Sequence, residues 1–299
     1  KPNGNFTSAC GQQIYCAKLF PESFHGNYFC CDPQQSMVHR AQIQREGSGI
    51  AVRRHPDNAD SEFLTSTDGW FRPNNLRVGP DGALYVIDMY REIIEDYSAI
   101  PRYMQQQYGL LNGNDRGRIW RVAPEKSKPI PIRTNRYEPA SSVSDQIKSL
   151  YNSSSKLVEA MKDSHYGVRV HALRVADQRF ETNPELLNAA LALIKSESDP
   201  NVLLQLALSL GESDDPRSVA GLVHLAAHHP DVRWMENAVL SSIGNKAGKF
   251  FELAIKEHSK MDASILEQAA QTAARTGDAK LLVAAVDYPD PALRLRILS

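Results

Sequence analysis

The sequence has no long apolar run and no excess of either charge, and each absence excludes a class of protein. None of its apolar runs approaches the roughly 20 residues that a helix needs to cross a bilayer. The net charge is -1 over 299 residues, so neither a nucleic-acid surface nor a polybasic membrane patch is predicted. The motifs GxSxG, GxxxxGKS/T and HExxH are also missing, which excludes the common hydrolase, P-loop and zinc-protease signatures.

Cysteine is scarce and confined to the start of the chain. The four cysteines are Cys10, Cys16, Cys30 and Cys31. They form neither CxxCH nor a pair of CxxC motifs, so neither haem attachment nor a zinc site is predicted within this chain. An even, clustered set favours a disulfide formed in an oxidising compartment, and buried thiols are the alternative.

The pairing of those cysteines depends on the register of one hairpin. The strings QQIYC and NYFCC flank the turn signal PESFHGN and are expected to pair antiparallel. A turn centred between Pro21 and Ser23 places Cys10 opposite Cys31. A turn centred nearer Phe24 would favour Cys16 with Cys30 instead, and the sequence leaves both registers open.

The first 125 residues have the pattern of antiparallel sheets. Short runs rich in β-branched and aromatic residues alternate with turn signals such as HGN, EGSG and GPDG, and no long helical pattern interrupts the first 90 residues. Two segments share one plan, an apolar strand that ends in an acid, at Asp32 and at Asp88. This repetition predicts about two blades of a β-propeller.

Residues 126–141 are predicted to be a linker and residues 142–299 a solenoid of helical hairpins. The string PEKSKPIPIRTNRYEPASS is rich in Pro, Lys and Ser, and the segments after it place apolar residues at helical spacing. Helix pairs recur about every 30–36 residues, as in solenoid repeats. The aspartates expected to cap helix N-termini are Asp199, Asp215, Asp231, Asp262 and Asp290.

Both ends of the chain suggest a piece of a longer protein. Two blades cannot close a propeller, which typically has four to eight. The chain also opens with Lys1 and stops at PALRLRILS, inside a predicted helix.

The strings NYFCCDPQQSMVHR, DGWFRPNNLRVGPDGALYVIDMYREIIE and NDRGRIWRVAP resemble the bacterial PVC-type membrane-bound dehydrogenases. Members of that family carry a propeller similar to the quinoprotein sugar dehydrogenases (an NHL-like propeller), then HEAT-like repeats, and often a C-terminal haem-c domain. The segments Asp163 to Ala172 and Asp231 to Ala238 loosely fit the HEAT pattern D-x-x-V-R-x-x-A.

The resemblance implies a function and a site. It implies oxidation of a sugar or related alcohol in the periplasm or cell envelope, with PQQ and Ca²⁺ in the complete protein. Electrons would pass to haem c in a region that this sequence does not contain, so the chain alone is expected to be inactive. Asp88 matches the acid near the quinone, with Tyr90 at the same channel mouth, and Arg72 and Asn74 match a basic residue and an amide. Cys10 and Cys31 match family cysteines.

Each candidate also has a structural interpretation. Asp88 and Asp32 are candidate Ca²⁺ ligands, and Asp88 a candidate base, but either can simply cap the turn after its strand. Arg72 and Arg91 are candidates to clamp an anionic cofactor, but either can pair with a neighbouring acid. The rival function is a binding protein or scaffold that recognises a glycan or a protein partner, the latter on the helical surface.

Overall fold

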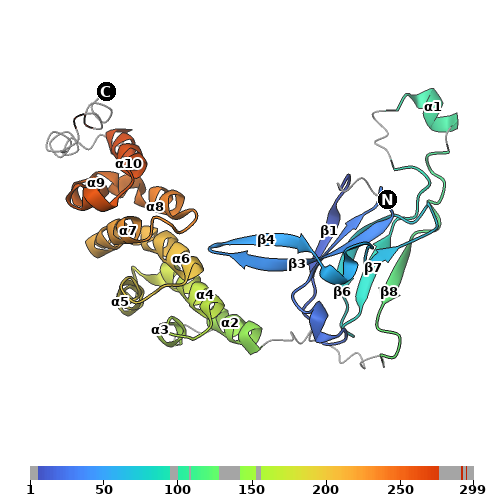
Figure 1. Cartoon of the computed structure of the whole chain (residues 1–299), viewed down its shortest axis with the longest axis horizontal. Coiled ribbons are helices and arrows are strands. Elements are labelled where there is room, and N and C mark those ends of the chain that lie inside the picture. The colour runs from blue at the N-terminus through green and yellow to red at the C-terminus, as the bar shows by residue number, and fades with distance from the viewer. Residues whose placement is uncertain are drawn as a thin grey trace. The chain divides into compact units, whose positions relative to one another are not determined.

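The computed structural model describes residues 6–94, 100–107, 109–127, 142–152 and 156–275, with 291 and 294 (Figure 1). The chain forms two compact units. The β unit consists of residues 1–44 and 50–142, and the helical unit consists of residues 45–49 and 143–299. From residue 128 on, the predicted linker lies outside the described residues.

The β unit contains two sheets. In the first, β1 (Cys10–Ile14), β2 (Tyr28–Asp32), β3 (Met37–Glu46) and β4 (Gly49–Arg54) follow in that order, and β5 (Leu64–Thr65) pairs with β3. In the second, β6 (Pro73–Val78), β7 (Leu84–Asp88) and β8 (Arg118–Val122) are antiparallel neighbours. Short helices η1 (Glu22–Phe24), η2 (Pro56–Asn58) and α1 (Arg102–Gln107) interrupt the strands.

The expectation of N-terminal antiparallel sheets followed by a helical region is confirmed. The first sheet has five strands and the second has three. Within the described ranges, neither sheet closes into a barrel or a propeller.

The alternation of β7 explains why this apolar strand ends in an acid. Leu84, Val86 and Asp88 are buried, whereas the two residues between them are half-exposed. Successive side chains of a strand point to opposite faces, so Asp88 shares the face of Leu84 and Val86. These two residues belong to a core that also contains Tyr15, which follows β1, and Phe29 of β2. The carboxylate of Asp88 therefore lies at the edge of the apolar core, at the end of the strand.

The helical unit follows as a series of short helices (Figure 1). They are α2 (Ser142–Asn152), α3 (Leu157–Ala160), α4 (Tyr166–Ala176), α5 (Pro184–Leu193), α6 (Pro200–Gly211), α7 (Pro216–His228), α8 (Met235–Ile243), α9 (Ala247–Ala254) and α10 (Ala263–Arg275). The 3-10 helices η4 (Asp177–Arg179), η5 (Gly244–Lys246) and η6 (Ile255–Lys260) extend three of them. Their buried faces form one apolar core that includes Leu173, Leu206 and Phe250.

Three of the predicted caps are confirmed. Asp199 accepts from the amide of Asn201, and Asp215 accepts from that of Arg217. Asp262 accepts from the amide of Ser264 at the start of α10. Asp290 lies outside the described residues.

The predicted cap at Asp231 is wrong. Helix α8 begins at Met235, and Trp234 occupies the cap position with φ 71° and no side-chain hydrogen bond. The left-handed backbone at Trp234 turns the chain into the helix three residues later than expected. Asp231 is consequently left in the loop between α7 and α8.

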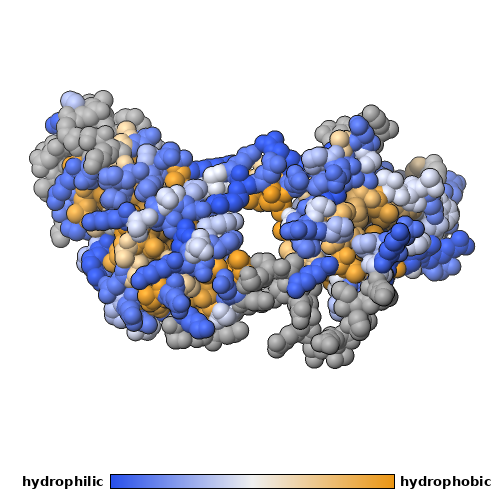
Figure 2. Space-filling view, turned by 60° about the horizontal axis from the view of Figure 1, so that its bottom comes forward, coloured by the Kyte–Doolittle hydropathy of each residue, from blue (hydrophilic) through white to orange (hydrophobic). Residues whose placement is uncertain are grey.

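Among the described residues, no helix is both long and apolar enough to span a membrane. Hydrophilic residues cover much of the surface of each unit, and apolar residues show through in patches (Figure 2). The exposed large side chains include Ile119 and Trp120 on β8 and Trp234 before α8.

Candidate functional site

Asp88 is the centre of a buried hydrogen-bond cluster at the end of β7. Its side chain is 2% exposed. One carboxylate oxygen accepts from the backbone amides of Arg72 at 2.9 Å and Tyr90 at 3.0 Å. The other accepts from the indole N–H of Trp120 at 3.0 Å, and Arg118 lies 3.8 Å away. These contacts fasten the turn after β7 to its two neighbouring strands.

Tyr90 adopts a strained backbone beside that carboxylate. Its φ is 52°, a left-handed value that non-glycine residues rarely adopt. Its hydroxyl donates to Asp68 at 2.9 Å, and this hydrogen bond raises the pKa of Tyr90. The Arg118 guanidinium stacks 4.0 Å from the ring centroid, and the Trp70 ring lies 5.8 Å away. The end of β7 therefore presents an aromatic and cationic surface next to a buried acid.

The Arg72 guanidinium is committed to main-chain oxygens. It donates to the carbonyls of Arg91 at 3.0 Å, Glu92 at 2.8 Å and Pro33 at 3.1 Å. Burial lowers the pKa of Arg72, and the charge of Asp88 acts in the opposite direction. Arg72 thus ties the turn after β2 to the segment after β7.

Asn74 and Arg91 flank the same region. The side-chain oxygen of Asn74 is buried and has no hydrogen-bond partner among the described residues. Arg91 donates to the carbonyl of Tyr90 at 3.1 Å, and its backbone amide donates to Trp70 at 3.1 Å. Asn74 therefore has one oxygen left for a further donor, whereas Arg91 mainly supports its own turn.

Asp32 holds the corresponding turn of the first sheet. It is fully buried and accepts from the Thr7 amide at 3.0 Å, the Ser8 hydroxyl at 2.9 Å and the Gln35 amide at 3.2 Å. Burial alone would raise the pKa of Asp32, but the combined hydrogen bonds from Thr7, Ser8 and Gln35 lower it. The ionised carboxylate is therefore the form that the fold stabilises.

The residues at these two strand ends do not fit a quinone with Ca²⁺. Calcium takes six to eight oxygen ligands, and no group of three or more His, Cys, Asp or Glu among the described residues could hold a metal. Asp32 and Asp88 each accept from protein donors that a bound cation would have to displace. Arg72 directs its donors to carbonyl oxygens, which leaves it poorly placed to clamp an anion.

The β1–β2 hairpin has the register that favours a link between Cys10 and Cys31. These two residues are direct partners in the antiparallel β1–β2 pair. No disulfide joins the described cysteines, so the bond itself stays a prediction. Burial raises the pKa of Cys30 to about 11 and that of Cys31 to about 12. Neither thiol is therefore activated as a nucleophile.

Three further side chains of the β unit, those of His39, Phe71 and Trp70, lie in different surroundings. His39 is buried and its ring nitrogen lies 2.7 Å from the Glu62 carboxylate. Phe71 belongs to the core of the β unit. Trp70, in contrast, lines a shallow cavity of about 590 Å³ together with residues 111–116.

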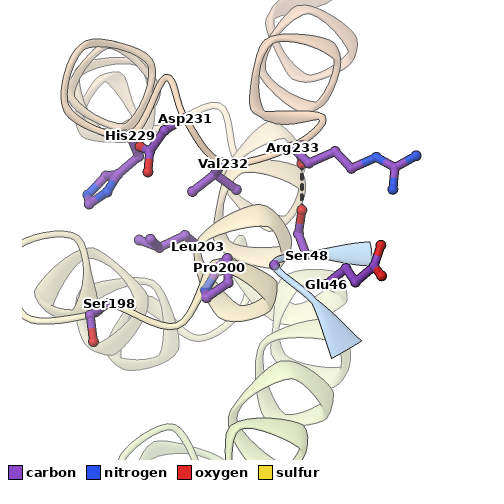
Figure 3. A pocket seen from close by; sticks show the side chains of 10 residues that line it. Glu46, Ser48, Ser198, Pro200, Leu203, His229, Asp231, Val232 and Arg233 are labelled. Atoms are coloured by element: carbon purple, nitrogen blue, oxygen red, sulfur yellow. Dashed lines mark hydrogen bonds between the residues drawn. The ribbon is translucent and has the colours of Figure 1, made fainter. Parts of the chain in front are cut away.

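A second candidate site lies in the helical unit. A cavity of about 480 Å³ is bounded by residues 46–48, by the start of α6 and by the loop before α8 (Figure 3). Pro200, Leu203 and Val232 give it an apolar floor. Ser198, His229 and Asp231 stand around that floor. The cavity thus combines a small apolar floor with a polar rim, and a concave site that holds both kinds of group can bind a ligand.

Polar contacts fix residues 45–49 at this cavity. The Ser48 hydroxyl donates to the Arg233 carbonyl at 2.6 Å (Figure 3). The side-chain amide of Asn201 donates to the Gly47 carbonyl at 3.1 Å, and Arg45 reaches both carboxylate oxygens of Asp199 at 3.1 and 2.9 Å. Asp199 is also the cap of α6, so one carboxylate orders both the helix start and the cavity wall.

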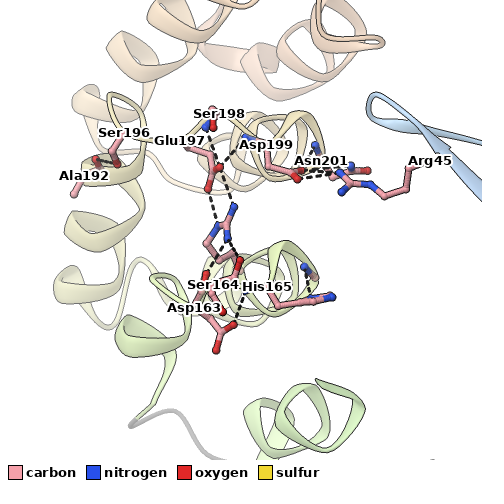
Figure 4. A network of polar contacts seen from close by, with 12 residues as sticks. Arg45, Asp163, Ser164, His165, Ala192, Ser196, Glu197, Ser198, Asp199 and Asn201 are labelled. Atoms are coloured by element: carbon pink, nitrogen blue, oxygen red, sulfur yellow. Dashed lines mark hydrogen bonds and ion pairs between the residues drawn. The ribbon is translucent and has the colours of Figure 1, made fainter. Parts of the chain in front are cut away.

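A deeper ion pair holds the repeat that carries α6. Arg169 on α4 donates to both carboxylate oxygens of Glu197 at 2.8 and 3.0 Å (Figure 4). Glu197 in turn accepts from the backbone amides of Ser198 and Asp199 at 2.9 and 2.8 Å. The loop that supplies Ser198 to the cavity is thereby held in one conformation.

This pocket could not be predicted from the sequence, where Asp231 was expected only to cap a helix. The available signal was the string HHPDVR between two helical patterns, which places polar groups in a loop. Nothing in the sequence indicates that residues 45–49 approach that loop, because 150 positions or more separate them.

Comparisons with known proteins find two partial matches. Residues 1–126 match a domain of unknown function, DUF7133, and residues 154–243 match HEAT repeats. No curated protein and no solved structure matches the chain. The helical region is therefore similar to HEAT repeats. The family that the β unit resembles has no described function, so this match indicates no activity.

Proposed function

We propose that the helical unit is a protein-binding module that recognises its partner through the pocket between α6 and the loop before α8. The observation that carries this proposal is the pocket itself, with its apolar floor and polar rim. The match to HEAT repeats supports it, because the matched range of 154–243 contains every lining residue except residues 46–48. Solenoid repeats commonly bind proteins on such surfaces.

The lining indicates what the partner presents. A cavity of about 480 Å³ with Leu203 and Val232 at its floor has room for one large apolar side chain. Asp231 is exposed and no described residue donates a hydrogen bond to its carboxylate. A Lys or Arg beside the apolar residue would pair with Asp231, and Ser198 and His229 would bind the peptide backbone.

The test is a selection of random peptides against the immobilised chain. We expect the enriched peptides to carry a large apolar residue next to Lys or Arg. Asp231→Lys should reduce their affinity at least tenfold, since it replaces an attractive charge by a repulsive one. Asp214→Lys makes the same charge change at an exposed position outside the pocket and should leave the affinity unchanged. Equal losses in both variants would reject the pocket.

The second candidate function is oxidation of a sugar or related alcohol by a propeller–HEAT dehydrogenase of the PVC type. Its support is the resemblance of the β unit, together with the strained Tyr90 beside the buried Asp88. Strained residues often mark functional sites. A partial propeller and a location outside the cytoplasm belong to this proposal.

The second candidate is tested on the longest protein that contains this chain. Dye-linked oxidation of a panel of sugars and alcohols would be measured. Asp88→Asn should abolish turnover if Asp88 acts on substrate, because Asn cannot take up a proton. Full turnover in Asp88→Asn with a lowered melting temperature would show that Asp88 only fastens its turn.

A further inference from the structure

Two histidines lie one turn apart at the end of α7. His224 and His228 have the i, i+4 spacing that places side chains on the same face of a helix. Their ring centroids are 4.1 Å apart and the rings are 20° from parallel. His224 is half-buried and His228 is exposed, so the pair is open to solvent on one side.

The hydrogen bond of His228 determines which nitrogen is available. Its Nδ1 lies 3.0 Å from the carbonyl oxygen of His224. A carbonyl oxygen only accepts, so Nδ1 carries the proton and Nε2 carries the lone pair. Histidines that bind metals usually donate their other ring N–H to a carboxylate or a backbone carbonyl in this way.

The ring of His224 completes the arrangement. No described residue hydrogen bonds to either of its ring nitrogens. The two rings are 20° from parallel, so their lone pairs run side by side, and both rings must turn about their broad side-chain torsions to share one ion. Zinc requires nitrogens at about 2.0–2.1 Å, which two neighbouring imidazoles can supply.

We propose that His224 and His228 form a binding site for one divalent transition-metal ion of the kind that prefers imidazole, with water in the remaining positions. Imidazole suits Zn²⁺, Cu²⁺ and Ni²⁺, whereas Mg²⁺ and Ca²⁺ prefer oxygen. Lys195 and His229 act on His224 in one direction and Glu257 in the other. The site is separate from the proposed partner pocket, whose lining includes neither histidine.

The consequence of metal binding is local. An ion held by residues of one turn would clamp the last turn of α7, which otherwise ends at His228. Anything that binds the folded chain and not the unfolded chain stabilises it. The metal should therefore raise the melting temperature of the helical unit.

The full chain is titrated with NiCl₂, ZnCl₂ or MgCl₂ in separate experiments, and the heat of binding is measured by isothermal titration calorimetry. The wild type should bind Ni²⁺ and Zn²⁺ but not Mg²⁺. His224→Ala and His228→Ala should each weaken one binding event at least tenfold, because one imidazole cannot chelate. His229→Ala is the matched control and should retain the wild-type affinity. The cysteines and the other histidines are the same in all variants, so only the differences between variants are interpreted.

For the wild type and each variant, the helical content is measured by circular dichroism, and the melting temperature is measured with and without metal. His224→Gln serves beside His224→Ala, since it preserves helix propensity and side-chain bulk. Loss of the shift in the variants of His224 and His228, with a retained helical spectrum, supports the site. Wild-type affinity in those variants, or a loss confined to His229→Ala, would overturn it.

Discussion

At the scale of single residues, the two acids that end strands are both saturated with donors. Asp88 accepts from two backbone amides and an indole, and Asp32 accepts from backbone amides and a hydroxyl. Both carboxylates are almost completely buried. An ionised carboxylate of this kind stabilises its turn by accepting these hydrogen bonds. Its removal leaves buried donors without an acceptor and lowers the free energy of unfolding.

Asp32 should make the stability of the β unit depend on pH. Its pKa in the folded chain lies below the ordinary value of 3.8. The stabilisation that ionised Asp32 contributes to the folded chain is therefore fully present above about pH 4. It is lost as the pH falls through the pKa that Asp32 has in the folded chain. Asp32→Asn should lower the free energy of unfolding at pH 7 by about 1–3 kcal/mol. Because Asn does not titrate, the difference from wild type should shrink on acidification below pH 4.

The measurement is chemical denaturation of both proteins between pH 2.5 and 7. Asp214→Asn removes an exposed carboxylate and should track the wild type. A constant difference between wild type and Asp32→Asn across the whole range would contradict the account.

The strand-end acids could be singled out from the sequence, but their partners could not. The repeated plan of an apolar strand followed by an acid drew attention to Asp32 and Asp88. The donors to Asp88 include Trp120, which is 32 positions away, and those to Asp32 include Thr7. A sequence pattern indicates which face of a strand is buried. It does not indicate which strands become neighbours, and these contacts depend on that pairing.

At the scale of elements, the β1–β2 hairpin has one of the two registers that the sequence left open. Cys10 faces Cys31, and a register shift separates that pair from Gln13 and Phe29. The sequence could give the antiparallel pairing, because turn signals and β-rich strings are local. It could not locate the irregularity in β1, where Gly11 has φ 58° and lies against the backbone of Asn75.

Oxidation should link Cys10 to Cys31. Directly opposite residues of an antiparallel pair have Cα atoms about 4.5–5.5 Å apart, which lies within the range of disulfides. The reaction should be slow in the folded protein, because burial raises the pKa of the Cys31 thiol to about 12. Peptide mapping by mass spectrometry after exposure to oxidised glutathione would identify the bond.

Two variants control that experiment. Cys31→Ser should abolish the link, and Cys30→Ser should leave it intact. A bond between Cys16 and Cys30 in the wild type would contradict the register.

The Arg169–Glu197 pair should be worth more to the helical unit than any of its exposed ion pairs. The two side chains are 15% and 5% exposed, and Glu197 also orders the loop before α6. Arg169→Met would leave a buried carboxylate without its cation and should lower the free energy of unfolding by about 3 kcal/mol. Lys249→Met breaks the exposed pair with Glu252 and should cost less than about 1 kcal/mol. Similar costs in the two variants, measured by urea denaturation, would count against a structural role for the buried pair.

At the scale of the whole molecule, composition and periodicity were enough to separate sheets from helices. The helical periodicity located most helices after residue 142, and three of the four described aspartate caps mark true helix starts. The assignment of residues 45–49 to the helical unit could not be predicted, because a polar hairpin tip carries no signal of its partner. The pocket depends on that assignment, and this is why the sequence did not reveal it.

The two units should unfold as separate cooperative transitions, because they have separate apolar cores. The core of the β unit contains Leu76 and that of the helical unit contains Leu206, and none of the described residues belongs to both. Residues 45–49 contribute polar contacts but no core side chain to the helical unit. Both leucines are completely buried, so replacing either by Ala should cost about 2–5 kcal/mol.

Differential scanning calorimetry of the full chain tests this expectation. The wild type should show two transitions, since domains with their own cores melt largely independently. Leu76→Ala should lower the midpoint of one transition and leave the other in place, and Leu206→Ala should do the reverse. In the double variant both midpoints should fall by their single-variant amounts, because distant sites without shared partners are additive. A single transition that both substitutions lower equally would mean that the chain folds as one cooperative body despite its two cores.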